Sequence, residues 1–553
     1  MPDSSRQPSR RATQRAARRR RDRRVRLVAA LAALLVTGVV AALLAQFGAT
    51  VLTPPLRAAR PPEPADPGCG PRAIQSLDSW RLARVERDPV AAPEKRRWEA
   101  ALGGPNAAQP AIRARMAGWP QTLLVDRTTL PRHPTEFAWR VARDTWRGLD
   151  ALTDREHGLP LDTVRVGPQP GAGAEAHAGD YTSTTNIGLH MIDVVAALEL
   201  GFIDRRAALD RISRTLDTLA RLQTDNGFYF NYYDTTSLER TSHFVSFVDS
   251  AWLTAGLMVV RMTFPELYQY ATLLIDQSDY AAMYDPVAGL MSHGYFVEPR
   301  APSRYHYGVL YTEARLGALI AIGKGAAPAS LWFTMTRTFP DDCHWQSLAP
   351  RGVRTKTILG TTFTAGYYEK AGLRYVPSWG GSMFEALMPT VVLDEASLAP
   401  RSLGANGTAH AIGQRRFARR TLHLPVWGFS PSATPGAEQY GEFGVKWLGS
   451  LGYPAGPVTP HASALALAVI PRSALHNLQT LASRYDVYGE YGFYDAVDPV
   501  SGQVAYKYLT LDQSMIFLAL TNHLTNHAIQ RRFADDPIVQ RALPVIALED
   551  FFD

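Results

Sequence analysis

The sequence contains little cysteine and, beyond its N-terminus, no excess of positive charge. Only Cys69 and Cys343 occur among 553 residues, which excludes a disulfide scaffold and a cysteine-rich metal cluster. The formal net charge is +7, but residues 1–26 hold eleven Arg and two Asp and carry +9, so residues 27–553 carry −2. A main body with this charge is not a basic nucleic-acid binder, and we expect no nucleic acid among its partners.

The chain also lacks the common motifs of nucleophile, phosphate and metal sites. It has no GxSxG nucleophile elbow and no GxxxxGKS or GxxxxGKT phosphate loop. Its histidines, among them His190, His293, His306 and His461, show neither HxH nor HExxH spacing, so a metal site is not expected. The sequence therefore predicts chemistry that needs no metal and no cofactor.

One long hydrophobic run lies close to the N-terminus. Residues 27–47 form 21 positions in which only Thr37 and Gln46 are polar, and a helix of that length spans the roughly 30 Å hydrocarbon core of a bilayer. Because the Arg-rich residues 1–26 favour the cytoplasmic side, we predict a single-pass signal anchor in the inner membrane and a periplasmic main body. A cleaved signal peptide is the less favoured alternative, since the run exceeds the usual length of about 7–15 residues and no A-x-A site follows it.

Residues 48–129 are rich in proline, charged and small residues. This composition is typical of a semi-rigid spacer that holds a folded body away from the membrane. Cys69 lies in the spacer and Cys343 lies in the body. The two can pair outside the cytoplasm, but two unrelated thiols is the slightly favoured interpretation.

The body, residues 130–530, alternates amphipathic helices with aromatic and Gly-rich loops, and a C-terminal tail, residues 531–553, follows it. In residues 204–222, apolar side chains recur every three or four positions, which predicts a helix with one buried face. Residues 186–200 are apolar nearly all round, so we predict a fully buried inner helix. Strand-like alternation is scarce, which favours an all-α fold.

Three turns of the form Asp-x-x-x-Gly form a weak internal sequence repeat. They occupy residues 154–158, 285–289 and 498–502, at unequal intervals that exclude a solenoid repeat. The pattern fits helical hairpins whose connecting loops gather on one face of a closed ring.

Several segments concentrate aromatic, amide and carboxylate residues as a sugar site does. Pyranose rings stack on Trp and Tyr, while sugar hydroxyls bind Asp, Asn, Glu and Arg. Cleavage of a glycosidic bond needs one protonated and one ionised carboxyl group. Aromatic walls raise the pKa of a carboxyl, which suits Glu385, beside Trp379 and Phe384, to the acid role. The segments are residues 228–234, 246–250, 311–315, 378–385, 427–430 and 491–495.

Structural roles for the same residues stay open. Glu313 precedes Arg315 on a predicted helix and can form half of a buried ion pair. Glu385 and Asp249 can cap helices, and Trp379 can be a core residue. Plausible turn residues are Asp234 and Asp495.

An ordered set of motifs runs through residues 130–525. It comprises Tyr181-Thr-Ser-Thr-Thr-Asn-Ile-Gly188, Leu198-Glu-Leu-Gly-Phe-Ile203, Asn231-Tyr-Tyr-Asp-Thr235, Phe247-Val-Asp-Ser250, Tyr311-Thr-Glu-Ala-Arg315, Ser378-Trp-Gly-Gly-Ser-Met-Phe-Glu385, Trp427-Gly-Phe-Ser430 and Tyr491-Gly-Phe-Tyr-Asp495. Together these motifs resemble the glucoamylase-like domain of cyclic β-1,2-glucan synthases and of bacterial endo-β-1,2-glucanases. The resemblance implies an (α/α)6 toroid that acts on glucans, with the site in the cavity at one end of the ring.

By this resemblance, the family's functional glutamates fall on Glu313 and Glu385, and its cavity aromatics fall on Trp379 and Trp427. One position departs from the pattern. Where the cyclic synthases have W-G-I-S-E-S, this chain has Trp427-Gly-Phe-Ser-Pro431-Ser432 and lacks the carboxylate. The form W-G-x-S-P also resembles other members of the wider glucoamylase-like group, so Pro431 can mark a subfamily. Candidates to take the missing role are Glu438, Glu442, Asp249 and Asp512.

The leading hypothesis is a membrane-anchored, extracytoplasmic glycoside hydrolase or transglycosylase that acts on a β-glucan or another envelope polysaccharide. Alternatives are a non-catalytic glycan-binding or scaffold protein, which the missing carboxylate favours, and a purely structural toroid. The predicted catalytic carboxylates are Glu313 and Glu385, followed by Asp249 and Asp512. The predicted substrate-binding residues are Trp379, Trp427, Tyr311, Asp234, Asp495 and Arg315.

Overall fold

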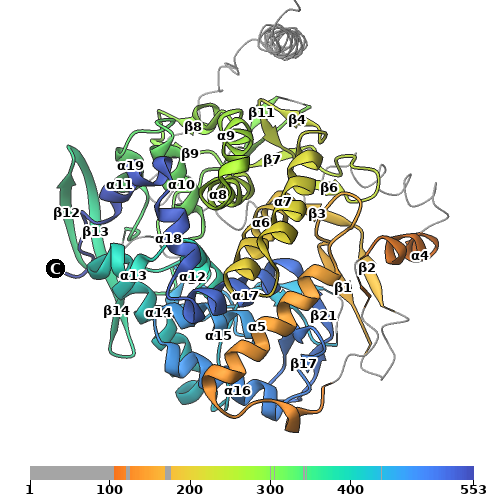
Figure 1. Cartoon of the computed structure of the whole chain (residues 1–553). Helices are drawn as coiled ribbons and strands as arrows, with labels where there is room; N and C mark the ends of the chain where they lie inside the picture. Colours follow the sequence, from red (N-terminus) through yellow and green to blue (C-terminus); the bar gives the residue numbers. More distant parts are fainter. Residues whose placement is uncertain are drawn as a thin grey trace, which may run out of the picture. The chain divides into compact units, whose positions relative to one another are not determined.

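The computed structural model describes residues 105–553 except 117, 120–124, 168–175, 299, 304, 341–342, 344–345 and 437–438 (Figure 1). The chain divides into two compact units, Met1–Glu63 and Pro64–Asp553, and the described residues belong to the second. The predicted anchor, residues 27–47, and Cys69 lie outside the described residues. Within the part that the structure describes, no helix is long and apolar enough to cross a bilayer.

Helices are the main regular secondary structure of the described part of the chain (Figure 1). They are α4 (Pro105–Arg115), α5 (Pro134–Ala151), α6 (Thr184–Glu199), α7 (Arg205–Leu219), α8 (Phe247–Thr263), α9 (Tyr268–Asp276), α10 (Ala314–Gly323), α11 (Ser330–Thr334), α12 (Met383–Leu387), α13 (Glu395–Leu398), α14 (Ala405–Arg416), α15 (Pro460–Leu465), α16 (Pro471–Arg484), α17 (Thr510–Leu524), α18 (Ala528–Ala534) and α19 (Pro537–Ile546).

Hydrophobic periodicity located two of these helices correctly. The predicted helix over residues 204–222 is α7, which Asp204 caps by accepting the backbone N–H of Ala207 at 2.8 Å. Its apolar stripe, including Ile212 and Leu216, is buried. The predicted inner helix is α6, whose residues from Thr184 to Ala197 are all buried, as expected for a sequence that is apolar on every side.

The buried helices follow one another in a closed succession. Helix α6 packs against α8 and α8 against α10, while α12 packs against α15, α15 against α17, and α17 against α6. Arg315 joins α10 to α12, because its guanidinium donates to the carbonyl oxygens of Glu385 at 3.0 Å and Ala386 at 2.7 Å. A second set of helices covers the first: α5 packs on α17, α7 on α6, α9 on α8, α14 on α12, and α16 on α15.

Helices α6 and α8 touch through two glycines. A Cβ atom at Gly188 would lie 2.3 Å from the carbonyl oxygen of Trp252, and a Cβ at Gly256 would lie 2.4 Å from the carbonyl oxygen of Gly188. Only residues without a side chain allow the two backbones to approach this closely. This contact fixes how the first turns of α6 and α8, which carry Thr185 and Asp249, lie relative to each other.

The expectation of an all-α fold is too narrow, because the described residues also form strands. The longest pair is a hairpin of β12 (Arg351–Ile358) and β13 (Thr361–Lys370), joined by Leu359 and Gly360 with positive φ angles of 48° and 75°. Figure 1 shows this hairpin beside the C-terminus, where Arg354 and Lys356 bind Asp553. The polar, Thr-rich faces of these strands gave no hydrophobic alternation to recognise.

The remaining strands have two or three residues each. They are β1 (Thr163–Arg165), β2 (His177–Gly179), β3 (Tyr181–Ser183), β4 (Thr224–Asp225), β5 (Phe228–Tyr229), β6 (Tyr232–Asp234), β7 (Phe244–Ser246), β8 (Tyr284–Asp285), β9 (Leu290–Met291), β10 (Gly294–Phe296), β11 (Ala301–Pro302), β14 (Leu373–Tyr375), β15 (Ser432–Ala433), β16 (Tyr440–Gly441), β17 (Tyr488–Gly489), β18 (Gly492–Phe493), β19 (Ala496–Val497), β20 (Val504–Ala505) and β21 (Lys507–Leu509).

The three Asp-x-x-x-Gly turns share one geometry. In each, the glycine has a φ between 67° and 77° and its N–H donates to the carbonyl oxygen of the aspartate at 2.8–2.9 Å. Each turn lies in the segment between two successive α-helices, α5 and α6, α9 and α10, or α16 and α17, so the interpretation as loops that connect helices is confirmed. Each closes a short antiparallel pair: β8 with β9, β19 with β20, and the bridge between Thr153 and Pro160.

The C-terminal residues pack onto the body. Helix α19 contacts α10, and Asp536 forms a buried ion pair with Arg261 at 2.6 Å. Cys343 is buried and disulfide-bonded, so the slightly favoured interpretation of two unrelated thiols is wrong for this residue.

Candidate functional site

A cavity of about 830 Å³, including its open mouth, lies where several buried helices begin. The first turns of α6, α8 and α17, the residue before α10, and α12 all contribute to its wall. Carboxyl groups and aromatic rings face each other across it. The lining residues are Asp162, Ser183, Thr185, Asn186, Tyr232, Val248, Asp249, Trp252, Tyr307, Glu313, Phe384, Met388, Pro431, Tyr440, Glu442 and Leu511.

Glu313 is a strongly perturbed carboxyl group in this cavity. It immediately precedes α10 and is 5% exposed. Burial, followed by the negative charge of Glu385, raises the pKa of Glu313 to about 8. Its Oε2 atom is buried and accepts no hydrogen bond from the described residues. A protonated carboxyl with a spare oxygen, in a cavity, is what a general acid requires at neutral pH.

The raised pKa of Glu313 has a consequence for stability. The folded protein keeps this proton up to about pH 8, whereas the ordinary pKa is 4.5, so the folded state binds more protons between these values. The contribution of Glu313 to stability is therefore fully present below pH 4.5 and is lost as the pH rises through 8. Glu313→Gln cannot ionise, so we expect its Tm to exceed that of the wild type by more at pH 8 than at pH 5. Equal Tm differences at both pH values in thermal unfolding would contradict the raised pKa.

Asp249 shares the cavity with Glu313. It lies in the first turn of α8, where the hydroxyl of Thr185 on α6 donates to its Oδ1 at 2.5 Å. Burial raises the pKa of Asp249, and its charge in turn raises the pKa of Glu313. The N-cap of α8 is Ser246, not Asp249, so the capping alternative for Asp249 is wrong.

Glu385 does not line the cavity. Its carboxylate accepts the backbone N–H groups of Gly380 at 3.0 Å and Ser382 at 3.1 Å and the hydroxyls of Ser378 and Ser382. Ser382 and Glu385 form a capping box at the start of α12. The alternative of a helix cap is therefore confirmed, and the negative charge of Glu385 acts on Glu313 from behind the cavity wall.

Asp512 and Asp495 also lie outside the cavity lining and form a buried cluster with His461. The Nδ1 atom of His461 lies 3.3 Å from Oδ2 of Asp512, and one ligand atom from each residue lies within 4.8 Å of the others. Burial raises the pKa of both carboxyls, and the charge of Asp495 raises that of Asp512 further. Asp495 also accepts the backbone N–H of Ala433 at 2.5 Å. In the described part of the chain, this cluster is the group whose spacing fits a metal ion.

The predicted sugar-binding rings are buried and do not line the cavity. Trp379 packs in a small core with Phe339 and Tyr453, and Tyr311 contacts His410 at a centroid distance of 4.8 Å. Trp427 is 1% exposed in the main core. The rings that line the cavity are instead Tyr232, Trp252, Tyr307, Phe384 and Tyr440.

Arg315 is a buried structural residue. Its guanidinium pairs with Glu395 at 2.6 Å and 3.0 Å and donates to the carbonyl of Thr312 at 2.8 Å, besides the two carbonyls of α12. Its carboxylate partner is therefore Glu395, and the alternative of a Glu313–Arg315 pair is wrong. By tying the start of α10 to α12, Arg315 positions the segment that carries Glu313.

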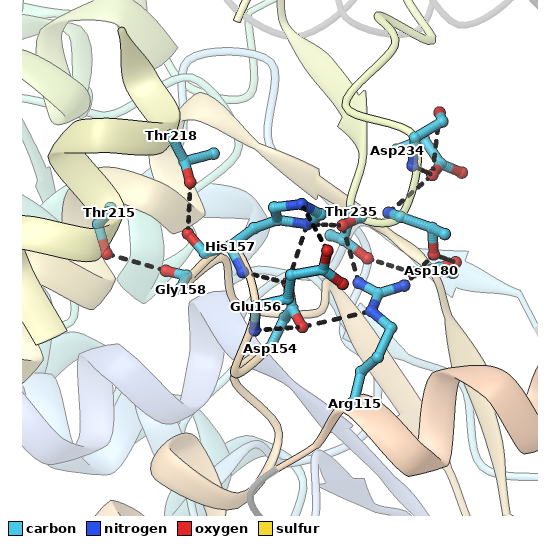
Figure 2. A network of polar contacts seen from close by, with 12 residues as sticks. Arg115, Asp154, Glu156, His157, Gly158, Asp180, Thr215, Thr218, Asp234 and Thr235 are labelled. Carbon is cyan, nitrogen blue, oxygen red and sulfur yellow. Dashed lines mark hydrogen bonds and ion pairs between the residues drawn. The ribbon is translucent and has the colours of Figure 1, made fainter. Parts of the chain in front are cut away.

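Asp234 belongs to a turn outside the cavity lining. Its Oδ1 accepts the backbone N–H groups of Thr236 and Ser237, both at 2.8 Å. Figure 2 shows Asp234 beside a polar network in which Arg115 and Asp180 meet Thr235. Burial and the charge of Asp180 raise the pKa of Asp234 to about 6. The turn alternative is confirmed.

Sequence reasoning missed part of the cavity. Asp162 accepts the side-chain amide of Asn186 at 2.9 Å and lines the wall, but a lone aspartate directly before the short strand β1 gives no motif. Trp252 was not predicted as a cavity residue, because it lies within the apolar sequence of α8. Glu442 was noted only as one of several substitutes for the carboxylate absent at Pro431, and the structure brings it into the cavity with Pro431.

Comparisons with known proteins agree with this architecture. The family model "Glycoamylase: Putative glucoamylase" matches residues 353–537. The cyclic beta-(1,2)-glucan synthase NdvB of Rhizobium meliloti (strain 1021) is 25% identical over 569 residues, which cover 75% of this chain and 19% of that protein. The chain thus corresponds to about one fifth of the length of this relative.

Solved structures show the same fold at low sequence identity. The beta-1,2-glucanase from Parabacteroides distasonis has a TM-score of 0.59 and 15% identity, and covers 75% of this chain and 60% of its own. The endo-beta-1,2-glucanase from Chitinophaga pinensis, bound to sophorotriose and glucose, has a TM-score of 0.55 and 15% identity, and covers 75% of this chain and 99% of its own. These matches agree with the resemblance at the level of the fold: the chain has a helix-rich fold like that of the solved glucanases.

Proposed function

We propose that this protein is a glycoside hydrolase or transglycosylase that acts on a β-glucan. The observation that carries the proposal is Glu313, a buried carboxyl group held protonated at neutral pH in an open cavity that also contains other carboxyl groups. Glycosidic cleavage needs a proton donor at the leaving oxygen and an ionised carboxylate elsewhere in the same cavity. The cavity has Glu313 as a proton donor and further carboxyl groups as candidates for the second role.

The lining of the cavity favours a saccharide over other ligands. Rings such as Tyr232, Trp252 and Phe384 offer flat apolar faces, while Asp162, Asn186 and other polar groups offer partners for hydroxyls. The solved neighbours include endo-β-1,2-glucanases bound to sophorotriose or sophorose. We therefore propose a β-1,2-linked glucan as the first substrate to test.

The closed succession of buried helices, covered by a second set, supports an (α/α)6 toroid with the cavity at one end. A purely structural toroid is less well supported, since a cavity of about 830 Å³, including its mouth, is open to a ligand. A non-catalytic glycan-binding protein would keep the aromatic rings but would not need Glu313 in its protonated form.

We also propose that residues 27–47 anchor this domain on the extracytoplasmic side of the inner membrane, as the Arg-rich start of the chain favours. Cell fractionation tests this proposal: the full chain should stay with the membrane after alkaline washing, and a variant without residues 1–47 should not. Full-length protein in the soluble fraction would contradict it.

Incubation with defined polysaccharides tests the proposed activity. We expect the purified full-length protein to release oligosaccharides, or to form transfer products, from linear β-1,2-glucan, and to do so less or not at all with β-1,3-, β-1,4- and β-1,6-glucans. Binding without cleavage would support the glycan-binding alternative. No product from any β-glucan would contradict the proposal.

A further inference from the structure

The cavity contains a carboxyl group, Glu442, that comes from a short hairpin and not from a buried helix. Strands β15 and β16 form this hairpin, and Glu442 directly follows β16. If the cavity cleaves glycosidic bonds, as proposed above, Glu313 needs an ionised carboxylate as its partner. The other lining carboxyls are Asp162 and Asp249, so the question is which of the three fills this role.

The register of the hairpin brings Glu442 to one particular place. Ser432 pairs with Gly441 and Ala433 pairs with Tyr440. One step further along this antiparallel register, Pro431 stands opposite Glu442, and both line the cavity. Glu442 therefore supplies a carboxylate across the hairpin from the position where the resemblance leads one to expect it.

The alternation of side chains along the strand agrees with this placement. Residues two apart on a strand face the same side, and both Tyr440 and Glu442 line the cavity. Glu442 is half-buried, and its Oε1 atom lies below the surface of the cavity wall. A carboxylate that lines the cavity is placed to take a proton from a water molecule inside it.

Backbone hydrogen bonds fix the hairpin at both ends. The N–H of Ala433 donates to Asp495 at 2.5 Å, and the hydroxyl of Ser430 accepts the N–H of Phe384 at 3.1 Å. After β16, the N–H of Val445 donates to the carbonyl of Gly381 at 3.0 Å. The buried Asp495 therefore holds strand β15 in place, and Glu442 belongs to a rigidly held segment, as a preorganised site requires.

The other two carboxyls are engaged by α6. Asp249 accepts the hydroxyl of Thr185 at 2.5 Å, and burial raises its pKa, which opposes the ionised form. Asp162 accepts the amide of Asn186 at 2.9 Å. Each hydrogen bond joins a neighbouring segment to the first turn of α6, so Asp249 and Asp162 have a structural role.

We propose that Glu442 is the ionised catalytic carboxylate that acts opposite Glu313. Glu313 gives its proton to the glycosidic oxygen, and the bond between this oxygen and C1 breaks with both electrons on the oxygen. Glu442 takes a proton from a water molecule whose oxygen forms the new bond to C1. One water is consumed, two saccharides form, and exchange of protons with solvent restores both carboxyl groups.

Two substitutions with two substrates test this assignment, once the wild type has been shown to cleave a β-glucan. We expect Glu442→Gln to lower kcat on the glucan by about 10²–10⁴-fold, the usual contribution of a general base. Its Tm should stay within about 2 °C of the wild type, because the side chain is half-buried and nearly isosteric. Glu369→Gln, the same change at an exposed residue of strand β13, is the matched control and should leave kcat unchanged.

A glycosyl fluoride separates the two roles. Fluoride leaves without a proton, so the β-fluoride of the same saccharide should restore turnover in Glu313→Gln but not in Glu442→Gln. In Glu442→Ala, added azide should attack C1 in place of the activated water and give an α-glycosyl azide. A residue that only supports the fold would yield neither result.

The outcomes distinguish this inference from the proposed function. A wild-type protein that cleaves no β-glucan contradicts the function itself. An active wild type in which Glu442→Gln keeps at least a third of its kcat contradicts only the assignment of Glu442. A large loss in Glu442→Gln with full recovery on the fluoride, or without an azide product in Glu442→Ala, also contradicts the assignment.

Discussion

Glu313→Gln is expected to lower kcat on the glucan substrate by about 10³-fold, within the range for loss of a general acid. Glutamine keeps the shape of the side chain but has no proton to give to the leaving oxygen. KM should change little, since the variant removes an interaction that matters in the transition state. Steady-state release of reducing ends measures both parameters.

The pH profile supplies an independent readout of the same residue. In the wild type, kcat should fall as the pH rises through about 8, because Glu313 then loses the proton that it donates. Glu369→Gln, at an exposed residue, should keep the wild-type rate and profile. A Glu313→Gln variant that retains more than a tenth of the wild-type kcat would remove Glu313 from the mechanism.

Arg315→Met is expected to destabilise the protein by about 3–5 kcal/mol, the usual effect of removing one partner of a buried ion pair. Arg315 and Glu395 are fully or almost fully buried, so the variant leaves a carboxylate without its counter-charge in the core. It also removes three hydrogen bonds to backbone carbonyls of the α10 and α12 segments. Urea unfolding measures the change in the free energy of unfolding.

An exposed ion pair provides the matched control. Arg205 and Glu266 pair at 2.8 Å with half of each side chain exposed, so Arg205→Met should cost only about 0–1 kcal/mol. Adding Glu395→Leu to Arg315→Met should recover part of the loss, because the unpaired charge disappears while the three carbonyls stay unsatisfied. If Arg315→Met costs no more than Arg205→Met, Arg315 does not hold α10 to α12.

Hydrophobic periodicity was sufficient to predict helices α6 and α7, but not to predict how the helices pack against one another. The stripe of α7 and the all-round apolar sequence of α6 identify both helices, because burial dictates their sequences directly. The closed succession depends on contacts between distant segments, such as α17 against α6, and was expected only from the resemblance and from the three Asp-x-x-x-Gly turns. The β12–β13 hairpin was missed because its faces are largely polar.

Local motifs predicted a site of carboxyl groups and aromatic rings, but several residues assigned to it are buried outside the cavity lining. Glu313 was identified because the Tyr311-Thr-Glu-Ala-Arg315 motif resembles that of the glucoamylase-like family. The Ser382-Met-Phe-Glu385 segment fits the S-x-x-E capping box, a local signal that explains why Glu385 turns to the backbone. A tryptophan in the core and one in a cavity have the same sequence signature, so Trp379 and Trp252 could be told apart only by the fold.

A crystal structure of the Glu313→Gln variant with a bound β-1,2-gluco-oligosaccharide tests the proposed role of Glu313 most directly. If Glu313 is the general acid, a glycosidic oxygen should lie within about 2.6–3.2 Å of the side chain at position 313, the distance needed for proton transfer. The sugar rings should lie against Trp252 or Phe384. An oligosaccharide bound elsewhere, or with every glycosidic oxygen beyond reach of that side chain, would contradict it.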